Sequence, residues 1–444
     1  MEKTNTIQTT DPGLFKLDGK PKFSAALPQA LQHVLAMLAG NITPPILIAQ
    51  AVDLSSEDQL ILIQAAMLIG GITTLLQLFP VWGFGMGLPS VMGVAFAYMP
   101  ILLSIGTTYG IGAIFGSQLI SGFLSIFIGV FIGKIRKFFP PIVSGTVVLS
   151  IGLSLYGTAI NYMAGGAGAG DNFGSGKFWL VAIVVLVTTL ACNFFGKGYI
   201  KVSGMLIGMG VGYILSIALG GMVNFSAIQD ASWFALPKIL HWKLSFPPIA
   251  VVSMILMYIV QAVQTIGDVS STAMGAFGRE ATDAEIGGAI KGQGICGMLG
   301  SIIGGLPTDP FSQNVGLIVT TKVVSKFVFV IVSGMLLIAG LIPKFGAVMT
   351  SIPYSVLGGA TVTVFAAITM SGIELIGEQP MNYRNKLIVG ISLAIGVGVS
   401  TVSNSLQFAP DIVKNIFGSS PIVLSFLMAF ILNIIVPEDN SIPD

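Results

Sequence analysis

The sequence predicts an all-α polytopic membrane protein, with about 14 transmembrane segments arranged as an inverted repeat of seven plus seven. Three observations lead to this fold class. First, only 9% of the 444 residues are charged and 54% are apolar, whereas about 25% of residues are charged in an average soluble domain. Second, the apolar residues fall into stretches long enough to cross a bilayer. Third, short motifs recur about half a chain length apart.

The individual segments follow from the length of apolar sequence that a membrane requires. A spanning helix needs about 20 predominantly apolar residues. Such stretches lie near residues 27–50, 59–79, 90–106, 109–133, 138–163, 178–195, 203–223, 248–274, 294–306, 311–325, 327–343, 354–376, 387–404 and 420–437. Gly and Pro interrupt the stretches 90–106 and 294–325, so we expect interrupted helices there, containing short extended strands.

The distribution of cations predicts the orientation of the chain. If the N-terminus is cytoplasmic, all but five of the 20 Lys and Arg residues lie on the cytoplasmic side; the exceptions are Lys177, Lys238, Lys243, Lys344 and Lys414. This bias alternates with each predicted crossing, as the positive-inside rule requires. We therefore expect a multi-pass protein of the cell inner (plasma) membrane, with both tails, residues 1–24 and 438–444, in the cytoplasm.

The composition also excludes several classes of function. A net charge of +1 gives no reason to expect a nucleic-acid partner. Cys192 and Cys296 lie in separate apolar stretches and form no disulfide or zinc pattern. The two histidines, His33 and His241, belong to no metal-binding motif. We expect no enzyme, no catalytic residue, no metal and no cofactor, and membrane lipid as the surroundings.

An internal repeat indicates a secondary transporter. Gly87-Leu88-Pro89 recurs as Gly305-Leu306-Pro307, and each proline precedes a short run that cannot form a normal membrane helix. A half with seven crossings, repeated once, must have the opposite topology in its second copy. Inverted repeats with paired interrupted helices are typical of secondary transporters, whose substrate site lies at the midplane between the breaks.

Polar residues within the apolar stretches mark the candidate site, because a central Asp costs about 2.5–3.5 kcal/mol on insertion scales. Gln261, Gln264 and Asp268 share one face of the stretch 248–274, and Ser271 or Thr272 continues it. This stripe either faces the substrate or hydrogen-bonds to a neighbouring helix.

The second break contains the other polar cluster. Pro307 and Pro310 disfavour helix, so we expect extended chain around Asp309 and a half-helix that begins near Ser312. Such a helix end presents free N–H groups to a polar ligand. Gln313 and Asn314 would lie at that end, where simple helix capping is the alternative role. The break of the first half contributes backbone and the aromatic face of Phe96, and His33 in the first helix is expected to act indirectly.

The segment Gln313-Asn314-Val315-Gly316-Leu317-Ile318-Val319-Thr320-Thr321-Lys322 matches the signature of the nucleobase/ascorbate transporter family, Gln-Asn-x-Gly-x4-Thr-Lys/Arg/Gly. The blocks Leu31-Gln32-His33, Leu88-Pro89 with Met92-Gly93, and Thr265-Ile266-Gly267-Asp268 also resemble family blocks and occur in the same order. The resemblance covers nearly the whole chain. Gln313 at the first motif position is similar to the bacterial purine permease branch, whereas the uracil branch carries Glu.

The resemblance implies a core (substrate) domain, helices 1–4 and 8–11, that moves against a gate domain, helices 5–7 and 12–14. In this chain the core would be residues 25–137 and 248–345, and the gate would be residues 138–247 and 346–437. It further implies elevator-type alternating access, a homodimer, and transport of a purine or pyrimidine base coupled to a proton, or to sodium. Because Gly316 and Thr321 belong to the family signature, the resemblance implies that they support the substrate site.

The chain also departs from the family pattern. Gln264 stands where the family usually has Glu, Gln293 stands where it often has Asp, and Asp309 replaces a small polar residue. An amide offers one donor and one acceptor edge, so we expect Gln264 and Gln313 to bind the N–H/C=O edge of a neutral 6-oxopurine (xanthine, urate, guanine or hypoxanthine), with Phe96 stacked on its ring. Coupling would depend on Asp268 or Asp309, since amides carry no proton.

The predicted site thus has two parts. The substrate-binding residues are Phe96, Gln264, Ser312, Gln313 and Asn314. The coupling or supporting residues are His33, Asp268, Gln293, Asp309, Gly316 and Thr321. The alternatives are a uracil permease of the same family, an anion exchanger of the same fold, a channel, and an ascorbate carrier.

Overall fold

The computed structural model describes residues 11–135, 140–223, 225–402, 405–410, 413–414, 417 and 421–437. Three of the cations on which the predicted orientation depends lie outside this range, namely Lys3, Arg136 and Lys137. The predicted cytoplasmic tail 438–444 also lies outside it. Within it the chain is built almost entirely of helices, which confirms the predicted all-α class.

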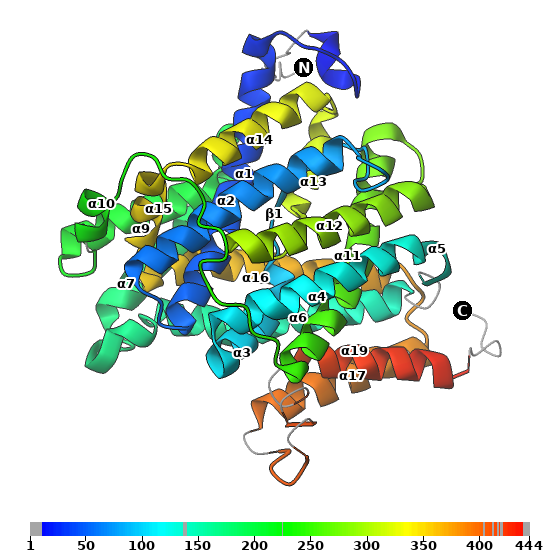
Figure 1. Cartoon of the computed structure of the whole chain (residues 1–444). Helices are drawn as coiled ribbons and strands as arrows, with labels where there is room; N and C mark the ends of the chain where they lie inside the picture. Colours follow the sequence, from blue (N-terminus) through cyan, green and yellow to red (C-terminus); the bar gives the residue numbers. More distant parts are fainter. Residues whose placement is uncertain are drawn as a thin grey trace.

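The helices follow one another along the predicted apolar stretches, and most of the long ones run side by side (Figure 1). In the first half they are α1 (Phe23–Ala51), α2 (Ser56–Leu78), α3 (Met99–Tyr109), α4 (Ile111–Val130), α5 (Ile132–Ile135), α6 (Pro141–Met163), α7 (Gly176–Phe195), α8 (Tyr199–Val202), α9 (Gly204–Leu219) and α10 (Ser226–Asp230). In the second half they are α11 (Pro248–Phe277), α12 (Asp283–Ile303), α13 (Ser312–Thr321), α14 (Lys326–Gly340), α15 (Pro343–Thr350), α16 (Tyr354–Gly377), α17 (Tyr383–Thr401) and α19 (Pro421–Ile435).

Eight of the described helices are long and apolar enough to cross a membrane, and a ninth span results if α14 and α15, which bend by 78°, are counted together. The predicted count of about 14 therefore stays a prediction. The eight or nine long helices are fewer than the predicted 14 segments because several segments are shorter than a full span. Helices α3 and α13 are half-helices next to strands, and α9 and α19 are short apolar helices.

The two predicted breaks meet at the centre of the molecule. Strand β1 (Met92–Val94) pairs antiparallel with β2 (Thr308–Pro310), and Gly93 lies opposite Asp309. Both strands are fully buried. Each pairs only with the other within the described chain, and each is followed by a half-helix, α3 or α13. Two segments that are each too short to cross the membrane thus satisfy their backbone groups through each other.

The helices pack in two groups. Helix α4 packs against α11 and α12, and α2 packs against α14. In the other group α16 packs against α6 and α7, and α17 packs against α19 and α6. Figure 1 shows α1 and α14 at one end of the molecule and α17 with α19 at the opposite end. The groove between α11 of the first group and α16 of the second contains the candidate site described below.

The N-terminal segment is more ordered than the predicted polar tail. A 3-10 turn, η1 (Pro12–Phe15), buries Leu14 completely. The carbonyl of Leu14 accepts hydrogen bonds from the backbone N–H groups of Val324 and Ser325, just before α14. Backbone N–H groups of Lys22 and Gly13 donate to the Asp11 carboxylate at 2.8 and 2.9 Å, and these bonds lower the pKa of Asp11. Their contribution to stability is present at neutral pH and is lost as the pH falls through the lowered value.

We expect Leu14→Ala to lower the thermal unfolding temperature of the detergent-solubilised protein. Removing a fully buried leucine side chain typically costs about 2–5 kcal/mol. The neighbouring Phe15 is 49% exposed, so Phe15→Ala is the matched control and should leave the temperature nearly unchanged. Equal losses in both variants would show that η1 does not anchor the N-terminus.

Candidate functional site

A cavity of about 1270 Å³ lies between α11 and α16 and reaches the paired strands. One face of α11 lines it with Gln264, Asp268 and Ser271, at the helical spacing predicted for the polar stripe. The half-helix α13 adds Ser312 and Gln313, and strand β2 adds Asp309. The cavity therefore brings the polar residues of two distant segments to one place.

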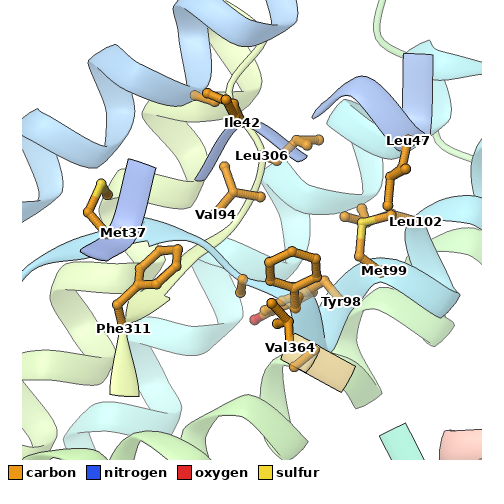
Figure 2. Packing of buried hydrophobic residues seen from close by; sticks show 14 of the residues in the cluster. Met37, Ile42, Leu47, Val94, Tyr98, Met99, Leu102, Leu306, Phe311 and Val364 are labelled. Carbon is orange, nitrogen blue, oxygen red and sulfur yellow. The ribbon is translucent and has the colours of Figure 1, made fainter. Parts of the chain in front are cut away.

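Hydrogen bonds from α1 and α2 hold strand β1 in position beside the cavity. The N–H of Val94 donates to Asn41 Oδ1 at 2.7 Å, and the N–H of Met92 donates to Thr74 Oγ1 at 3.0 Å. Figure 2 shows the side chains of Met37 and Phe311 near Val94, the last residue of this strand. Gly93 has no room for a side chain, because a Cβ atom there would overlap the Phe311 ring. The strand therefore depends on glycine and on the Asn41 amide.

Asp309 is 6% exposed and lines the inner part of the cavity. Gln261 Nε2 donates to Asp309 Oδ2 at 2.8 Å, and Gln264 Nε2 lies 3.5 Å from the same oxygen, at the limit of a hydrogen bond. The two amides of α11 thus face the carboxylate of β2. The hydrogen bond from Gln261 to Asp309 is well formed. The contact from Gln264 to Asp309 is long, so the Gln264 amide can break it and bind a ligand instead.

Asp268 lies one turn further along α11. Ser312 Oγ donates to Asp268 Oδ1 at 3.2 Å, and Gln264 lies four residues earlier on the same face of α11. Asp268 Oδ2 is buried and has no partner. Ser312 makes no cap on α13, so its hydroxyl serves Asp268. Gln264 therefore lies between two carboxylates, one on its own helix and one on β2.

Gln313 and Phe96 complete the lining near the strands. Gln313 is exposed to the cavity at the first turn of α13. Phe96 is 7% exposed and is held by an edge-on contact with Phe365 of α16, with ring centroids 5.7 Å apart. An aromatic face and two amide side chains thus border the same space.

Other predicted residues support the site from behind. Asn314 is fully buried and does not line the cavity. Its Nδ2 donates to the His33 carbonyl and contacts His33 Nδ1, both at 3.0 Å, and the His33 ring packs against Phe329. This pair ties α13 to α1. Gln293, 5% exposed, accepts a hydrogen bond from Thr265 Oγ1 through its Oε1 atom.

The last two motif residues lie along α13. Gly316 has open space where a Cβ atom would stand. Thr321 donates to the Leu317 carbonyl and accepts a hydrogen bond from the N–H of Val323 at the helix end. The two hydrogen bonds of Thr321 stabilise the C-terminal end of α13. Neither Gly316 nor Thr321 lines the cavity.

The opposite wall of the cavity was not predicted from the sequence. One face of α16 lines the cavity with Val364, Ile368, Ser371 and Glu374, and Glu378, the residue that follows the helix, continues this face. The polar members are spaced three and four residues apart, which is the pattern of one helix face. That spacing in an apolar stretch was the signal available in the sequence. No cluster of three His, Cys, Asp or Glu residues suited to a metal occurs in the described part of the chain.

This cavity can bind a small planar molecule and can distinguish ligands by the hydrogen-bond donors and acceptors on their polar edge. Apolar and aromatic surface with a few convergent polar groups is typical of small-molecule sites. The two cavity-facing amides can each donate and accept, whereas the carboxylates accept when ionised. The carboxyl groups of Asp268 and Asp309 can also take up or release a proton.

Comparisons with known proteins agree with this arrangement. Residues 24–405 match the Xan_ur_permease family, described as "Permease family". The chain is 36% identical over 416 residues to the nucleobase transporter PlUacP of Paenibacillus larvae, covering 92% of this chain and 94% of that protein. It is 34% identical to the uric acid permease PucJ of Bacillus subtilis, over 91% of both chains. It is also 34% identical to the xanthine permease of Bacillus subtilis, over 93% of this chain and 94% of that one.

Among solved structures, the transmembrane domain of a cyanobacterium bicarbonate transporter, BicA, matches with a TM-score of 0.59 at 15% identity, covering 94% of this chain and 99% of that domain. At this identity the likeness concerns the fold alone. The family match spans residues 24–405 and so includes every residue of the cavity, and the relatives cover more than nine-tenths of the chain. The protein is therefore a membrane transporter and belongs to the Xan_ur_permease family of permeases.

Proposed function

We propose that this protein imports a nucleobase, and specifically a 6-oxopurine such as xanthine, urate, guanine or hypoxanthine. The observation that carries the proposal is the single cavity that Gln264, Gln313 and Phe96 all line. The printed names of the relatives, a nucleobase transporter and uric acid and xanthine permeases, support the same class of substrate.

The chemistry of the amides favours the 6-oxopurine. Its N1–H and C6=O groups form an edge with one donor and one acceptor. A glutamine amide presents the complementary acceptor and donor, so Gln264 or Gln313 can satisfy both groups at once. Gln264 is available because its contact with Asp309 is long, at 3.5 Å. Phe96 would stack on the ring.

We propose proton symport through the carboxyl groups beside the substrate. Gln264 cannot carry a proton, whereas Asp309 and Asp268 can. Asp309 contacts Gln264, and Asp268 lines the same cavity one turn further along α11. Uptake of a proton by either carboxyl would change the hydrogen bonds that Gln264 can offer to the base. Sodium is the alternative coupling ion.

Alternating access would move the two helix groups against each other. The cavity lies between α11 and α16, which belong to different groups, so a rigid shift of one group would carry the site across the membrane, as in an elevator. We place the core at residues 25–137 and 248–345, the gate at residues 138–247 and 346–437, and both termini in the cytoplasm. A homodimer formed through the gate domain would hold the gate still.

The test is uptake of radiolabelled hypoxanthine by cells that lack their own base carriers and express this chain. Unlabelled guanine, hypoxanthine, xanthine, urate and uracil are offered as competitors, with and without an uncoupler. We expect 6-oxopurines to compete and uracil to compete poorly. Competition by uracil alone would overturn the purine assignment in favour of the uracil permease, and uptake of none of the bases would overturn the proposed function.

A further inference from the structure

Gln261 is a buried glutamine of α11 that reaches the site from behind. It is 2% exposed and does not line the cavity, so it does not bind the base itself. Its Nε2 atom donates to Asp309 Oδ2 at 2.8 Å, which joins α11 to strand β2. Polar side chains inside membrane helices are costly and mark functional positions by default. The contact with Asp309 is therefore where a function of Gln261 must be sought.

The other end of the Gln261 amide is unused. Its Oε1 atom is buried and has no hydrogen-bond partner among the described residues. The nearby Thr265 hydroxyl contacts the backbone carbonyl of Gln261 and the Oε1 atom of Gln293, both at 3.0 Å. The Gln261 amide is thus held at one end, by Asp309. A half-turn of this amide about its last side-chain bond would break no hydrogen bond other than the one to Asp309.

The two ends of the amide match the two protonation states of Asp309. An ionised carboxylate only accepts hydrogen bonds, and Nε2 is a donor. A protonated carboxyl group can donate its O–H, and the amide Oε1 is an acceptor. Gln261 can therefore pair with Asp309 in either state. Gln264 differs, because it lines the cavity and its contact with Asp309 is long, at 3.5 Å.

We propose that Gln261 is a positioning residue for proton coupling, which holds the Asp309 carboxyl in both protonation states and sets how readily it releases its proton. This inference rests on the proposed function and deepens it. When Asp309 takes up a proton, its new O–H donates to Gln261 Oε1. When the proton leaves to the cavity, the amide turns back and Nε2 donates to the carboxylate. Gln261 itself neither gains nor loses a proton.

Other titratable groups surround Asp309 in the described chain. Asp268 of α11 and Tyr98, which follows β1, lie close enough to interact electrostatically with Asp309. Tyr258 of α11 packs edge-on against Tyr98, with ring centroids 5.2 Å apart, and Cys296 belongs to α12, which also packs against β2. The remaining acidic groups that line the same cavity are Glu280, Glu374 and Glu378. The test must therefore show that an effect of Gln261 passes through Asp309.

The experiment measures initial uptake of radiolabelled hypoxanthine by proteoliposomes with a fixed internal pH and a varied external pH. Gln261→Met keeps the length of the side chain and removes the amide, so the ionised carboxylate loses a donor. Asp309 then holds its proton more firmly. We expect the external pH of half-maximal uptake to move up by about one unit, or tenfold in proton affinity. The maximal rate should fall, because release of the proton inside becomes slower.

Gln261→Glu is the second variant. It keeps a polar side chain of the same length, and a second carboxyl group beside Asp309 opposes the ionisation of that residue. The pH of half-maximal uptake should therefore move in the same direction as in Gln261→Met. If Gln261→Met fails to fold, Gln261→Glu decides the matter.

Gln64→Met is the matched control. Gln64 is also a buried glutamine, 8% exposed, and its Nε2 atom donates to the Gly340 carbonyl at 3.1 Å. It does not line the cavity. The same substitution there removes one buried hydrogen bond and should leave the pH of half-maximal uptake unchanged. Size-exclusion chromatography before reconstitution shows how much of each variant is folded.

A second comparison tests whether Gln261 acts through Asp309. In the Asp309→Asn background, hypoxanthine counterflow is measured over the same pH range with and without Gln261→Met. We expect the two pH profiles to coincide, because residue 309 then has no proton for the amide to control.

The outcomes separate this inference from the proposed function. A pH profile that is unchanged in both Gln261 variants would overturn the positioning role and leave import of a nucleobase intact. A shift that persists in the Asp309→Asn background would also overturn it, since Gln261 would then act through another group. Wild-type uptake without any pH dependence would do the same. Absence of uptake of every base by the wild-type chain would instead refute the proposed function.

Discussion

Replacing Asp309 with Asn is expected to abolish concentrative uptake of the base while exchange of base for base continues. Asp309 is the buried carboxyl that faces both Gln261 and Gln264. Asparagine keeps an oxygen that can accept the 2.8 Å hydrogen bond from Gln261, so the local geometry is preserved. It cannot take up or release a proton. A carrier without that step equilibrates its substrate but does not accumulate it.

The measurement compares two assays on the same cells. Accumulation of labelled hypoxanthine under an imposed pH gradient should fall about tenfold or more, since a coupled proton supplies that much driving force per pH unit. Counterflow in vesicles preloaded with unlabelled hypoxanthine should persist. Asp268→Asn is the matched comparison, because Asp268 is the second carboxyl at Gln264. If accumulation is lost only in Asp268→Asn, Asp268 and not Asp309 is the coupling residue. If uptake is insensitive to both variants and to the uncoupler, transport is coupled to sodium or is not coupled to an ion.

Replacing Gly93 with Val should eliminate transport through a steric effect at the strand pair. Gly93 lies opposite Asp309 in the β1–β2 register. A Cβ atom at this position would overlap the Phe311 ring and would lie 2.7 Å from Asn41 Oδ1 and 3.0 Å from the Met37 methyl group. Valine adds two further methyl groups. Overpacking a tight core costs about 1–3 kcal/mol or more, and here the displaced groups hold the strand.

We expect hypoxanthine uptake by Gly93→Val to fall at least about tenfold, because 1.4 kcal/mol already corresponds to tenfold in an equilibrium. The amount of protein in the membrane is measured in parallel by immunoblot. Gly334→Ala in α14 is the control, since the space around Gly334 is open, and it should transport normally. Full activity of Gly93→Val would mean that the two strands do not pack as closely during transport as they do here.

Much of the fold could be predicted from local sequence. The membrane class follows from composition, and the helices follow from the lengths of the apolar stretches. Pro89, Pro307 and Pro310 predicted the two breaks, and β1 and β2 occur there. The half-helix predicted near Ser312 begins at that residue. Each of these inferences concerns a residue and its immediate neighbours, for which helix geometry and the missing N–H of proline suffice.

The candidate site was only partly predictable. Gln264, Asp268, Asp309, Ser312, Gln313 and Phe96 all line the cavity as the sequence suggested. Asn314 instead turns inward to His33, 281 residues away in the chain. The polar face of α16 could not be recognised from the sequence, because Glu374 and Glu378 lie at the end of an apolar stretch, where charged residues are usual at a solvated helix end.

By itself the sequence determined the membrane class, the family resemblance and the places where the chain must break, since these depend on composition and on short-range backbone geometry. Only the tertiary structure decided which polar groups meet: Gln261 with Asp309, Asn314 with His33, and an acidic face of α16 across the cavity from α11. The reason is that periodicity places a side chain on one face of its own helix. Its partner across the cavity depends on how segments distant in sequence pack together.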